Sequence, residues 1–476
     1  MTQIATLICV LGILGLFLLN WDSKAKTSKA LWIPLIWLLI AGSRNVGEWL
    51  QSGTPLLVSD NPYVEGNAID RNLLAGLVAL GVIVLIRRRH TVGKILSANW
   101  AILLFLVYCL VSVYWSDFPY VGFKRWIRFS GDLVMVLVIL SDHDWLAARK
   151  KILAWPAFVL LPLSILFIRY YPNLGRTYSR WDYFVSWTGV STTKNGLGMI
   201  SMIFGLAAAS RLLDLFRDGQ ESNNKMRVLI VHGTIFAMAL YLIQVAHSAT
   251  SLACFILGGA VLVLTSWRTV ARWPGLVHIL LGSLLFISYA SLFIIPGSGL
   301  LEFLGRNSTL TGRTDVWTRV VTLVRSPAFG TGFESFWIGS RLAEMRLLDP
   351  SLNQAHNGYL EIYLNLGWVG LTLLAIVILA GYRNAISAFH RDPNTAKLRL
   401  AYFVIALSYN FTEGAFKMMD PIWILFLLST IALPVDATEE SPVVLPEPFL
   451  QTTTFAKPKP QVDDALVARF PNKRTT

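Results

Sequence analysis

The amino-acid sequence predicts an all-α protein that crosses a membrane many times. Of its 476 residues, 54% are hydrophobic and 14% are charged, whereas soluble domains average about 25% charged residues. Several apolar runs reach the roughly 20 residues that an α-helix needs to cross a bilayer. Lys and Arg recur in alternate loops between these runs, which is typical of the cytoplasmic loops of polytopic membrane proteins.

About 12 to 13 membrane-spanning helices are expected from the apolar runs. The candidate segments are residues 4–20, 30–43, 72–86, 99–115, 127–141, 152–171, 196–216, 226–246, 248–266, 276–295, 361–382, 399–411 and 420–434. No basic residue precedes the first apolar core, whereas Lys24, Lys26 and Lys29 follow it. We therefore expect an uncleaved first helix with its N-terminus outside the cytoplasm. Alternation from that point places the basic loops in the cytoplasm, at residues 87–89, 149–151, 211–227, 268–272 and 383–399.

The chain is expected to form one integral membrane domain, residues 1–434, with a large periplasmic loop at about 296–360. Residues 435–476 combine repeated prolines with mixed charge, which predicts a disordered cytoplasmic tail. The net charge is +13, but no contiguous basic face or nucleic-acid-binding motif accompanies it, so we expect no nucleic-acid partner. The three cysteines lie inside apolar runs and show neither a disulfide framework nor metal-ligand spacing.

The longest polar interval before the tail contains the residues best suited to bind an anion. Six arginines and no lysine occur between residues 306 and 346. The rigid guanidinium fork matches phosphate and carboxylate oxygens in a bidentate way, which a lysine cannot do. Arginine also dominates the basic residues of the other predicted outer loops. This bias favours an anionic ligand on the outer face.

Residues 312–325 within this interval have the spacing of an amphipathic helix, which Ser326-Pro327 would end. Such a helix fits the surface of a membrane. It could simply cover the helical bundle, or it could hold Arg313 and Arg325 at the depth of lipid headgroups.

A lone histidine, His356, stands where the chain becomes apolar again. If the next helix begins near Asn353, one face carries His356, Leu360, Tyr363, Gly367 and Gly370. Glycines on that face would let another helix approach closely. An imidazole has the unperturbed pKa suited to proton transfer near neutral pH, but it could equally cap the helix or satisfy a buried polar contact.

Several motifs in this region together carry a family resemblance. They are Thr311-Gly312-Arg313, residues 326–332 (SPAFGTG), and His356-Asn357 followed after nine residues by Gly367-x-x-Gly370. In this order they resemble the superfamily of O-antigen ligases and O-antigen polymerases. Residues 187–198, which contain Lys194-Asn195-Gly196, resemble especially the exopolysaccharide polymerisation members. The resemblance covers roughly residues 185–432, and the first helices only by architecture.

The resemblance implies a metal-independent glycosyltransferase of the bacterial inner membrane that needs no cofactor. Such an enzyme would move glycan from an undecaprenyl-pyrophosphate donor to the hydroxyl of an acceptor sugar. His356 occupies the position of the proposed general base, and Arg313 matches a pyrophosphate-binding arginine by motif. Further expected contacts are Arg176, Arg180 and Arg325 to the pyrophosphate, and Lys194, Asn195 and Asn357 to other parts of the substrates.

Three functions remain open from the sequence. The Lys194-Asn195 segment favours a polymerase of lipid-linked repeat units that makes an exopolysaccharide or a similar polymer. A ligase that transfers finished glycan to lipid A core or to protein would use the same chemistry. A transporter is the alternative of another class, with Asp132 as its best intramembrane ionisable residue. The expected partners are the lipid-linked oligosaccharide, membrane lipid, and a chain-length regulator and flippase of the same pathway.

Overall fold

The computed structural model describes residues 1–22, 26–51, 67–178, 185–215, 222–267, 270, 273–293, 313–348, 350 and 352–433. Helices dominate these residues, and a two-stranded antiparallel sheet pairs β1 (Arg176–Tyr178) with β2 (Val185–Trp187). The chain divides into one compact unit, Met1–Pro434, and a second, Val435–Thr476. The second unit lies outside the described residues, so the disordered tail stays a prediction.

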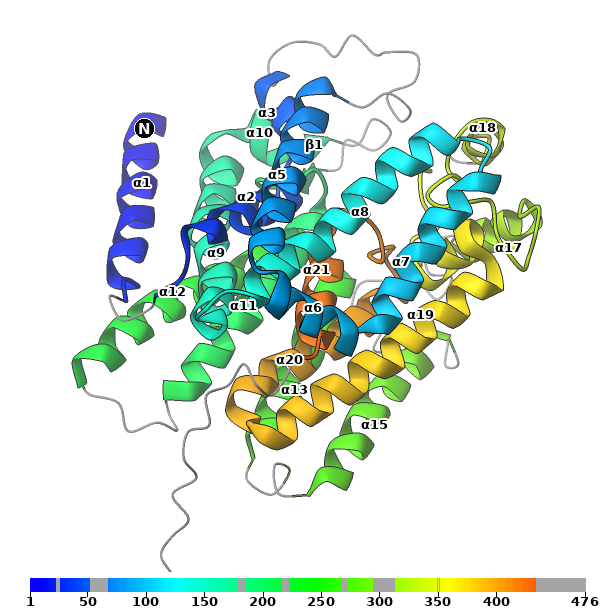
Figure 1. The fold of residues 1–476 in the computed structure, drawn as a ribbon. Coiled ribbons are helices and arrows are strands. Elements are labelled where there is room, and N and C mark those ends of the chain that lie inside the picture. The colour runs from blue at the N-terminus through cyan, green and yellow to red at the C-terminus, as the bar shows by residue number, and fades with distance from the viewer. Residues whose placement is uncertain are drawn as a thin grey trace, which may run out of the picture. The chain divides into compact units, whose positions relative to one another are not determined.

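The apolar pattern of the sequence correctly locates the helices (Figure 1). In chain order the main helices are α1 (Thr2–Leu19), α2 (Trp32–Ala41), α3 (Val46–Gln51), α5 (Ala68–Arg87), α6 (Arg89–Ala98), α7 (Trp100–Ser112), α8 (Pro119–Leu140), α9 (Trp145–Tyr170), α10 (Pro172–Gly175), α11 (Lys194–Leu215), α12 (Ser222–Ala246), α13 (Ala249–Ser266), α15 (Pro274–Phe293), α17 (Arg313–Thr322), α18 (Ser340–Arg346), α19 (Gly358–Arg391), α20 (Pro393–Tyr409) and α21 (Pro421–Thr430). Every apolar segment predicted from the sequence overlaps one of them. The chain is therefore an all-α polytopic membrane protein.

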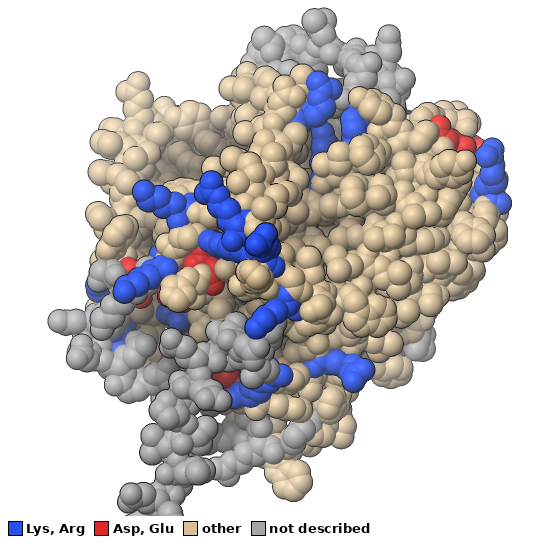
Figure 2. All heavy atoms as spheres, viewed as in Figure 1, with Lys and Arg blue, Asp and Glu red and all other residues tan. Residues whose placement is uncertain are grey.

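Seven of the described helices are long and apolar enough to cross a bilayer, or eight if the bent pair α6–α7 is one span. The other predicted segments form helices that are shorter or more charged. The 10 residues of α21 measure about 15 Å, half of a hydrocarbon core of about 30 Å. Helix α8 instead carries Lys124, Arg125, Arg128 and Asp132. On the face shown in Figure 2, uncharged residues predominate, as expected for a surface in contact with lipid.

Loops that the sequence assigns to the cytoplasm contact one another. Arg88 Nη2 lies 3.3 Å from Asp142 Oδ2, which joins the loop after α5 to the loop after α8. Lys397 Nζ lies 2.6 Å from Asp214 Oδ1, which joins the start of α20 to the end of α11. These contacts place the predicted cytoplasmic loops at one end of the bundle.

Loops that the sequence assigns to the outer face also contact one another. Gly47 N donates to Asp70 Oδ1 at 2.8 Å, and Asn195 Nδ2 donates to Glu413 Oε1 at 3.0 Å. The guanidinium of Arg44 donates to the backbone carbonyl of Ser191. These contacts agree with the prediction that successive loops lie alternately on the two sides of the membrane. Which group of loops faces the cytoplasm stays a prediction.

Asp132 is a buried structural link rather than an open intramembrane carboxylate. Its side chain is completely inaccessible, and it accepts hydrogen bonds from Trp37 Nε1 at 2.8 Å and from Met419 N at 3.0 Å. These bonds join α2 and α8 to the turn before α21. A buried carboxylate is tolerated only when such donors satisfy it.

The long loop before α19 contains the predicted amphipathic helix. Helix α17 spans Arg313–Thr322, with Val320 fully buried and Val321 44% exposed. It packs with α18 in a small apolar cluster of its own, formed by Val320, Phe336, Met345, Leu352, Ala355 and Leu364. The loop therefore has a separate core and holds its polar residues in defined places.

The expected helical face through His356, Gly367 and Gly370 is wrong. Helix α19 begins at Gly358, five residues after the expected start, and Asn357 is its N-cap. At Gly367 the backbone leaves the helical region, with φ 65° and ψ −164°. His356 therefore precedes the helix, and the face that would have joined it to the glycines is interrupted.

The break at Gly367 is where residues 326–332 bind to α19. Trp368 N donates to Pro327 O at 2.9 Å, and Val369 N donates to Ala328 O at 3.1 Å. A Cβ on Gly367 would lie 2.3 Å from Ala328 O. Glycine is needed here because the backbone has a positive φ and a second backbone passes in contact. The two glycine-containing motifs therefore hold each other in place.

Candidate active site

A carboxylate lies between His356 and Asn195, two of the predicted site residues. His356 Nδ1 lies 3.1 Å from Glu413 Oε2, and Asn195 Nδ2 donates to Glu413 Oε1 at 3.0 Å. The Glu413 side chain is 8% exposed and the His356 side chain is 31% exposed. The imidazole is therefore accessible while its acidic partner is buried.

The start of α19 is held against the turn that carries Glu413. Asn357 Oδ1 accepts from the backbone N–H groups of Tyr359 and Leu360, both at 3.0 Å. Gly358 N lies 2.9 Å from Asn410 O and 3.1 Å from Glu413 O. Because Asn357 caps the helix, its side-chain oxygen is engaged by the backbone, and this cap fixes the residue next to it, His356.

The geometry defines how the imidazole can act. If Nδ1–H donates to Glu413, then Nε2 is the basic nitrogen, and the carboxylate stabilises the imidazolium that forms when Nε2 takes a proton. His356 has a φ of +52°, a conformation that non-glycine residues adopt uncommonly. Such strained conformations occur preferentially at functional sites. The pair is thus arranged as a general base with an orienting carboxylate.

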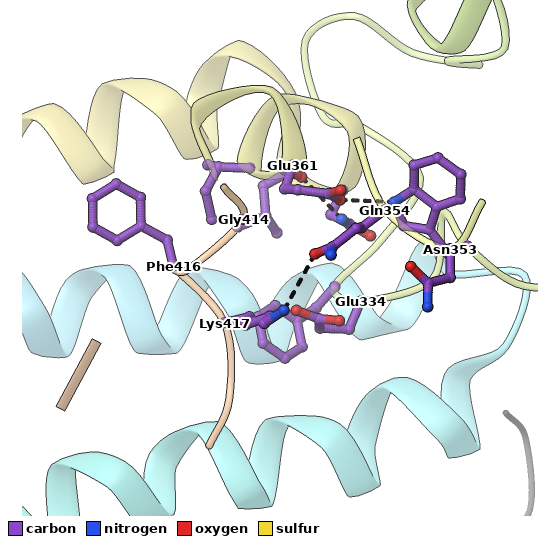
Figure 3. Close-up of a pocket in the computed structure, with 12 residues that line it drawn as sticks. Glu334, Asn353, Gln354, Glu361, Gly414, Phe416 and Lys417 are labelled. Carbon is purple, nitrogen blue, oxygen red and sulfur yellow. Dashed lines mark hydrogen bonds between the residues drawn. The ribbon is translucent and has the colours of Figure 1, made fainter. Parts of the chain in front are cut away.

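Sequence neighbours of this pair line a cavity of about 170 Å³, which Figure 3 shows. Its lining includes Gln354, two residues before His356, and Gly414, which follows Glu413. The other polar lining residues are Glu334, Asn353, Glu361, Asn365 and Lys417, and the aromatic ones are Phe333, Trp337 and Phe416. Amide, carboxylate and aromatic groups of this kind suit a neutral ligand rich in hydroxyl groups.

Two of the cavity's polar groups are fixed by the protein. Glu361 accepts from Trp337 Nε1 at 2.8 Å and also from Ala355 N. Lys417 Nζ donates to Gln354 Oε1 at 3.3 Å. Glu361 therefore orients the indole of Trp337 and the segment that leads to His356.

A second cavity, of about 440 Å³, contains two arginines. Arg341 Nη1 lies 2.8 Å from Asp117 Oδ2, whereas Arg325 Nη1 is 3.5 Å from Asp117 Oδ1. The Arg325 side chain is 81% exposed and that of Arg341 is 13% exposed. Arg325 is thus largely exposed, and its predicted contact with the pyrophosphate stays a prediction. Arg341, to which the sequence assigned no role, is committed to Asp117.

Arg176 and Lys194 have different environments. Arg176 donates from Nε and Nη2 to Ile168 O at 3.0 and 2.8 Å, and its guanidinium lies 4.5 Å from the centre of the Trp187 ring. These contacts fasten the β1–β2 hairpin to α9. Lys194 is the exposed first residue of α11, next to Asn195.

The remaining two predicted arginines are not described in full. Arg180 lies outside the described residues, and Arg313 begins α17 without a described side chain. Their roles as pyrophosphate ligands stay predictions.

Sequence reasoning missed Glu413. The interval between the last two apolar segments is only eight residues, 412–419, and Glu413 is its one acidic residue. An acidic side chain in a short loop on the same predicted side as His356 is the signal that could have found it. Its contact with His356 spans 57 positions of the chain and needs the tertiary structure.

Helices long enough to span a bilayer define the class as a membrane-embedded protein, and a histidine–carboxylate pair lies at one end of its bundle. Residues 233–375 match a family model described as O-Antigen ligase. This range contains Arg313, residues 326–332, His356 and both glycines of the Gly-x-x-Gly motif. The match confirms, for residues 233–375, the resemblance drawn from the motifs.

Curated relatives extend this similarity beyond residues 233–375. The chain is 25% identical over 337 residues to the exopolysaccharide production protein ExoQ of Rhizobium meliloti, covering 66% of this chain and 72% of that protein. It is 22% identical over 347 residues to a "Putative polysaccharide ligase" of Rickettsia typhi, covering 70% and 80%. A protein of the same name from Rickettsia conorii is 26% identical over 226 residues, covering 45% and 53%.

Proposed function

We propose that the protein polymerises undecaprenyl-pyrophosphate-linked oligosaccharide repeat units into an exopolysaccharide or similar surface polysaccharide. The reaction takes place at the periplasmic face of the bacterial inner membrane. The observation that carries the proposal is the contact between His356 Nδ1 and Glu413 Oε2 at 3.1 Å. His356 lies within the region that matches the O-antigen ligase model, and neighbours of His356 and Glu413 line a cavity suited to a sugar.

The proposed chemistry needs one proton transfer and one substitution. His356 Nε2 takes the proton of an acceptor hydroxyl, and Glu413 stabilises the imidazolium. The oxygen attacks the anomeric carbon of the donor sugar while the bond from that carbon to the pyrophosphate oxygen breaks. Undecaprenyl pyrophosphate leaves with the bonding electrons, and a single displacement inverts the anomeric centre. The donor bond supplies the energy, so no nucleotide is required.

In the proposal, the acceptor sugar and the donor pyrophosphate bind to different groups because the pyrophosphate is negatively charged and the sugar is neutral. The cavity beside His356 has two carboxylates, Glu334 and Glu361, and one cation, Lys417, which favours a neutral acceptor sugar over a pyrophosphate. The pyrophosphate binds instead to arginines, for which Arg313 and Arg325 are the first candidates and Arg176 and Arg180 the second. Guanidinium groups that bind the pyrophosphate also stabilise the negative charge that grows on it as it leaves.

Polymerase activity is favoured over ligase activity by two observations. The Lys194-Asn195 segment resembles the exopolysaccharide polymerisation members of the superfamily, and the relative ExoQ is named for exopolysaccharide production. A ligase remains the alternative, because the Rickettsia relatives carry that name. A transporter would depend on Asp132, whose carboxylate already accepts two hydrogen bonds inside the protein.

The test is complementation of a deletion strain, with polymer length profiled on gels. We expect His356→Ala to reduce chain elongation about 10²-fold or more, the contribution typical of a general base. Arg313→Ala and Arg313→Lys should both impair elongation, because a point charge cannot replace the guanidinium fork. Arg319→Ala is the matched control. Arg319 lies on the same helix as Arg313, α17, and pairs at the surface with Glu344 of α18.

Each result has a defined meaning when immunoblots show equal protein in the membrane fraction. Loss of long chains supports a polymerase. Retained length with loss of attachment to the cell surface supports the ligase. Normal polymer from the His356→Ala strain would refute both.

A further inference from the structure

A cavity of about 310 Å³ lies at the opposite end of the bundle from His356, between α9, α11, α12 and the start of α20. Its charged lining residues are Asp22, Arg149, Lys150, Lys151, Arg211 and Asp214. Four cations thus face two carboxylates. The cations come from two different helices, so the cavity concentrates positive charge beyond what a single helix end would provide.

The protein neutralises only part of this excess charge. Asp214 lies 2.6 Å from Lys397 Nζ, a cation outside the lining, and 3.7 Å from Arg211 Nη1. Arg149 Nη2 donates to a backbone carbonyl, that of Thr395, at 2.9 Å. Lys151 Nζ donates to the hydroxyl of Thr27 at 2.7 Å. Because Arg149 and Lys151 are held by neutral groups, their charge remains available to an anion.

The deeper wall of the cavity is apolar. It includes Ala154, Ala157 and Phe158 of α9, and Phe204 and Ala207 of α11. Small side chains leave a groove between the helices. A hydrated inorganic anion has no apolar surface to bury in this groove. A ligand that fills both parts of the cavity must have an anionic head and an apolar tail.

The cavity borders the end of helix α1, most of whose residues are not buried. Helix α1 contacts α9 and α12, yet only 6% of its residues are buried, and it stands to one side in Figure 1. Asn20 and Asp22, just beyond its end, line the cavity. An apolar tail can therefore pass between α1 and its neighbours into the surrounding lipid.

We propose that this cavity binds an anionic phospholipid. Lys150 of α9 and Arg211 of α11 hold the phosphate, and an acyl chain lies against the alanines of α9 and α11. The bound lipid ties α9 and α11 to the end of α1. This role is independent of the glycosyl transfer proposed at His356.

The test uses the full chain, purified in detergent and depleted of lipid. Thermal unfolding is measured during titration with phosphatidylglycerol, with phosphatidylcholine, and with inorganic phosphate. We expect phosphatidylglycerol alone to raise Tm. Lys150→Glu should weaken its apparent affinity about tenfold, because the reversed charge opposes the phosphate. Arg89→Gln removes an exposed charge at the same end, outside the cavity, and should leave the affinity unchanged.

The other outcomes overturn the proposal. Equal protection by phosphatidylcholine would show a general detergent-replacement effect, and protection by phosphate alone would show a site for a free anion. Equal affinity in Lys150→Glu and wild type would place the lipid elsewhere. Because Lys150→Gln removes the charge without reversing it, an intermediate affinity for it separates loss of charge from misfolding of the Lys150→Glu variant.

Discussion

In the proposed mechanism, Glu413 sets which nitrogen of His356 is basic. Its buried carboxylate lies 3.1 Å from Nδ1, so Nδ1–H donates to it in this mechanism and Nε2 accepts the proton. Asn195 contributes by holding the second carboxylate oxygen. Asn195 and Asn357 were both predicted to contact a substrate. In the structure, Asn195 holds the carboxylate next to His356, and Asn357 caps the start of α19.

The variant Glu413→Gln tests this role. An amide can still accept from Nδ1–H, but it stabilises an imidazolium much less than a carboxylate does. We expect polymer elongation to fall about 10²-fold, with protein levels near wild type, measured in membranes supplied with lipid-linked donor. Glu344→Gln is the matched control, because the Glu344 pair with Arg319 is at the surface and such pairs contribute less than about 1 kcal/mol. Full activity in Glu413→Gln would remove the carboxylate from the mechanism.

At the level of elements, the site depends on how α19 is interrupted. The break at Gly367 accepts the backbone of residues 326–332 through Thr331, Trp368 and Val369. That segment leads from Arg325 towards Phe333 and Trp337, which line the cavity beside His356. The Gly-x-x-Gly motif therefore fixes the loop that forms both cavities.

Replacing Gly367 by alanine should destabilise the protein and reduce activity. The new Cβ would overlap Ala328 O, 2.3 Å away, in a backbone conformation that costs about 1–3 kcal/mol for a side chain to adopt. We expect a Tm several degrees below wild type in detergent. The matched control is Gly259→Ala in α13, where a Cβ meets nothing within 4 Å and helix propensity favours alanine by about 1 kcal/mol. Equal Tm values for the two variants would show that the loop does not depend on the break.

For the whole molecule, the contacts group the loops into two ends but do not say which end faces the cytoplasm. Arg88 and Asp142 mark one end, and His356 and Glu413 mark the other. The proposed reaction requires the second end to face the periplasm.

Cysteine labelling tests this orientation. Ser340 and Ser97 are exposed positions at the two ends, and each is replaced by cysteine in a background without Cys9, Cys109 and Cys254. We expect a membrane-impermeant maleimide to label Ser340→Cys in intact spheroplasts, and to label Ser97→Cys only after lysis. The reverse pattern would contradict both the orientation and the proposed periplasmic reaction.

Much of the molecule follows from local sequence. Apolar runs locate the membrane helices because each must cover its own backbone polar groups and expose hydrocarbon to lipid. The spacing of residues 312–325 predicts α17, and the motif around His356 marks the candidate base. These features depend on residues close together in the chain, so their pattern is visible without the fold.

Tertiary structure alone decided the rest. The start of α19 and the break at Gly367 depend on Asn357 as a cap and on the backbone of Ala328, which no periodicity reveals. Arg176 was expected at the pyrophosphate, yet it binds Ile168 O. Above all, Glu413 reaches His356 only because Gly358 packs on the turn at Asn410. Hydrophobic pattern determines which segments enter the membrane, but the pairing of distant polar groups depends on how those segments pack.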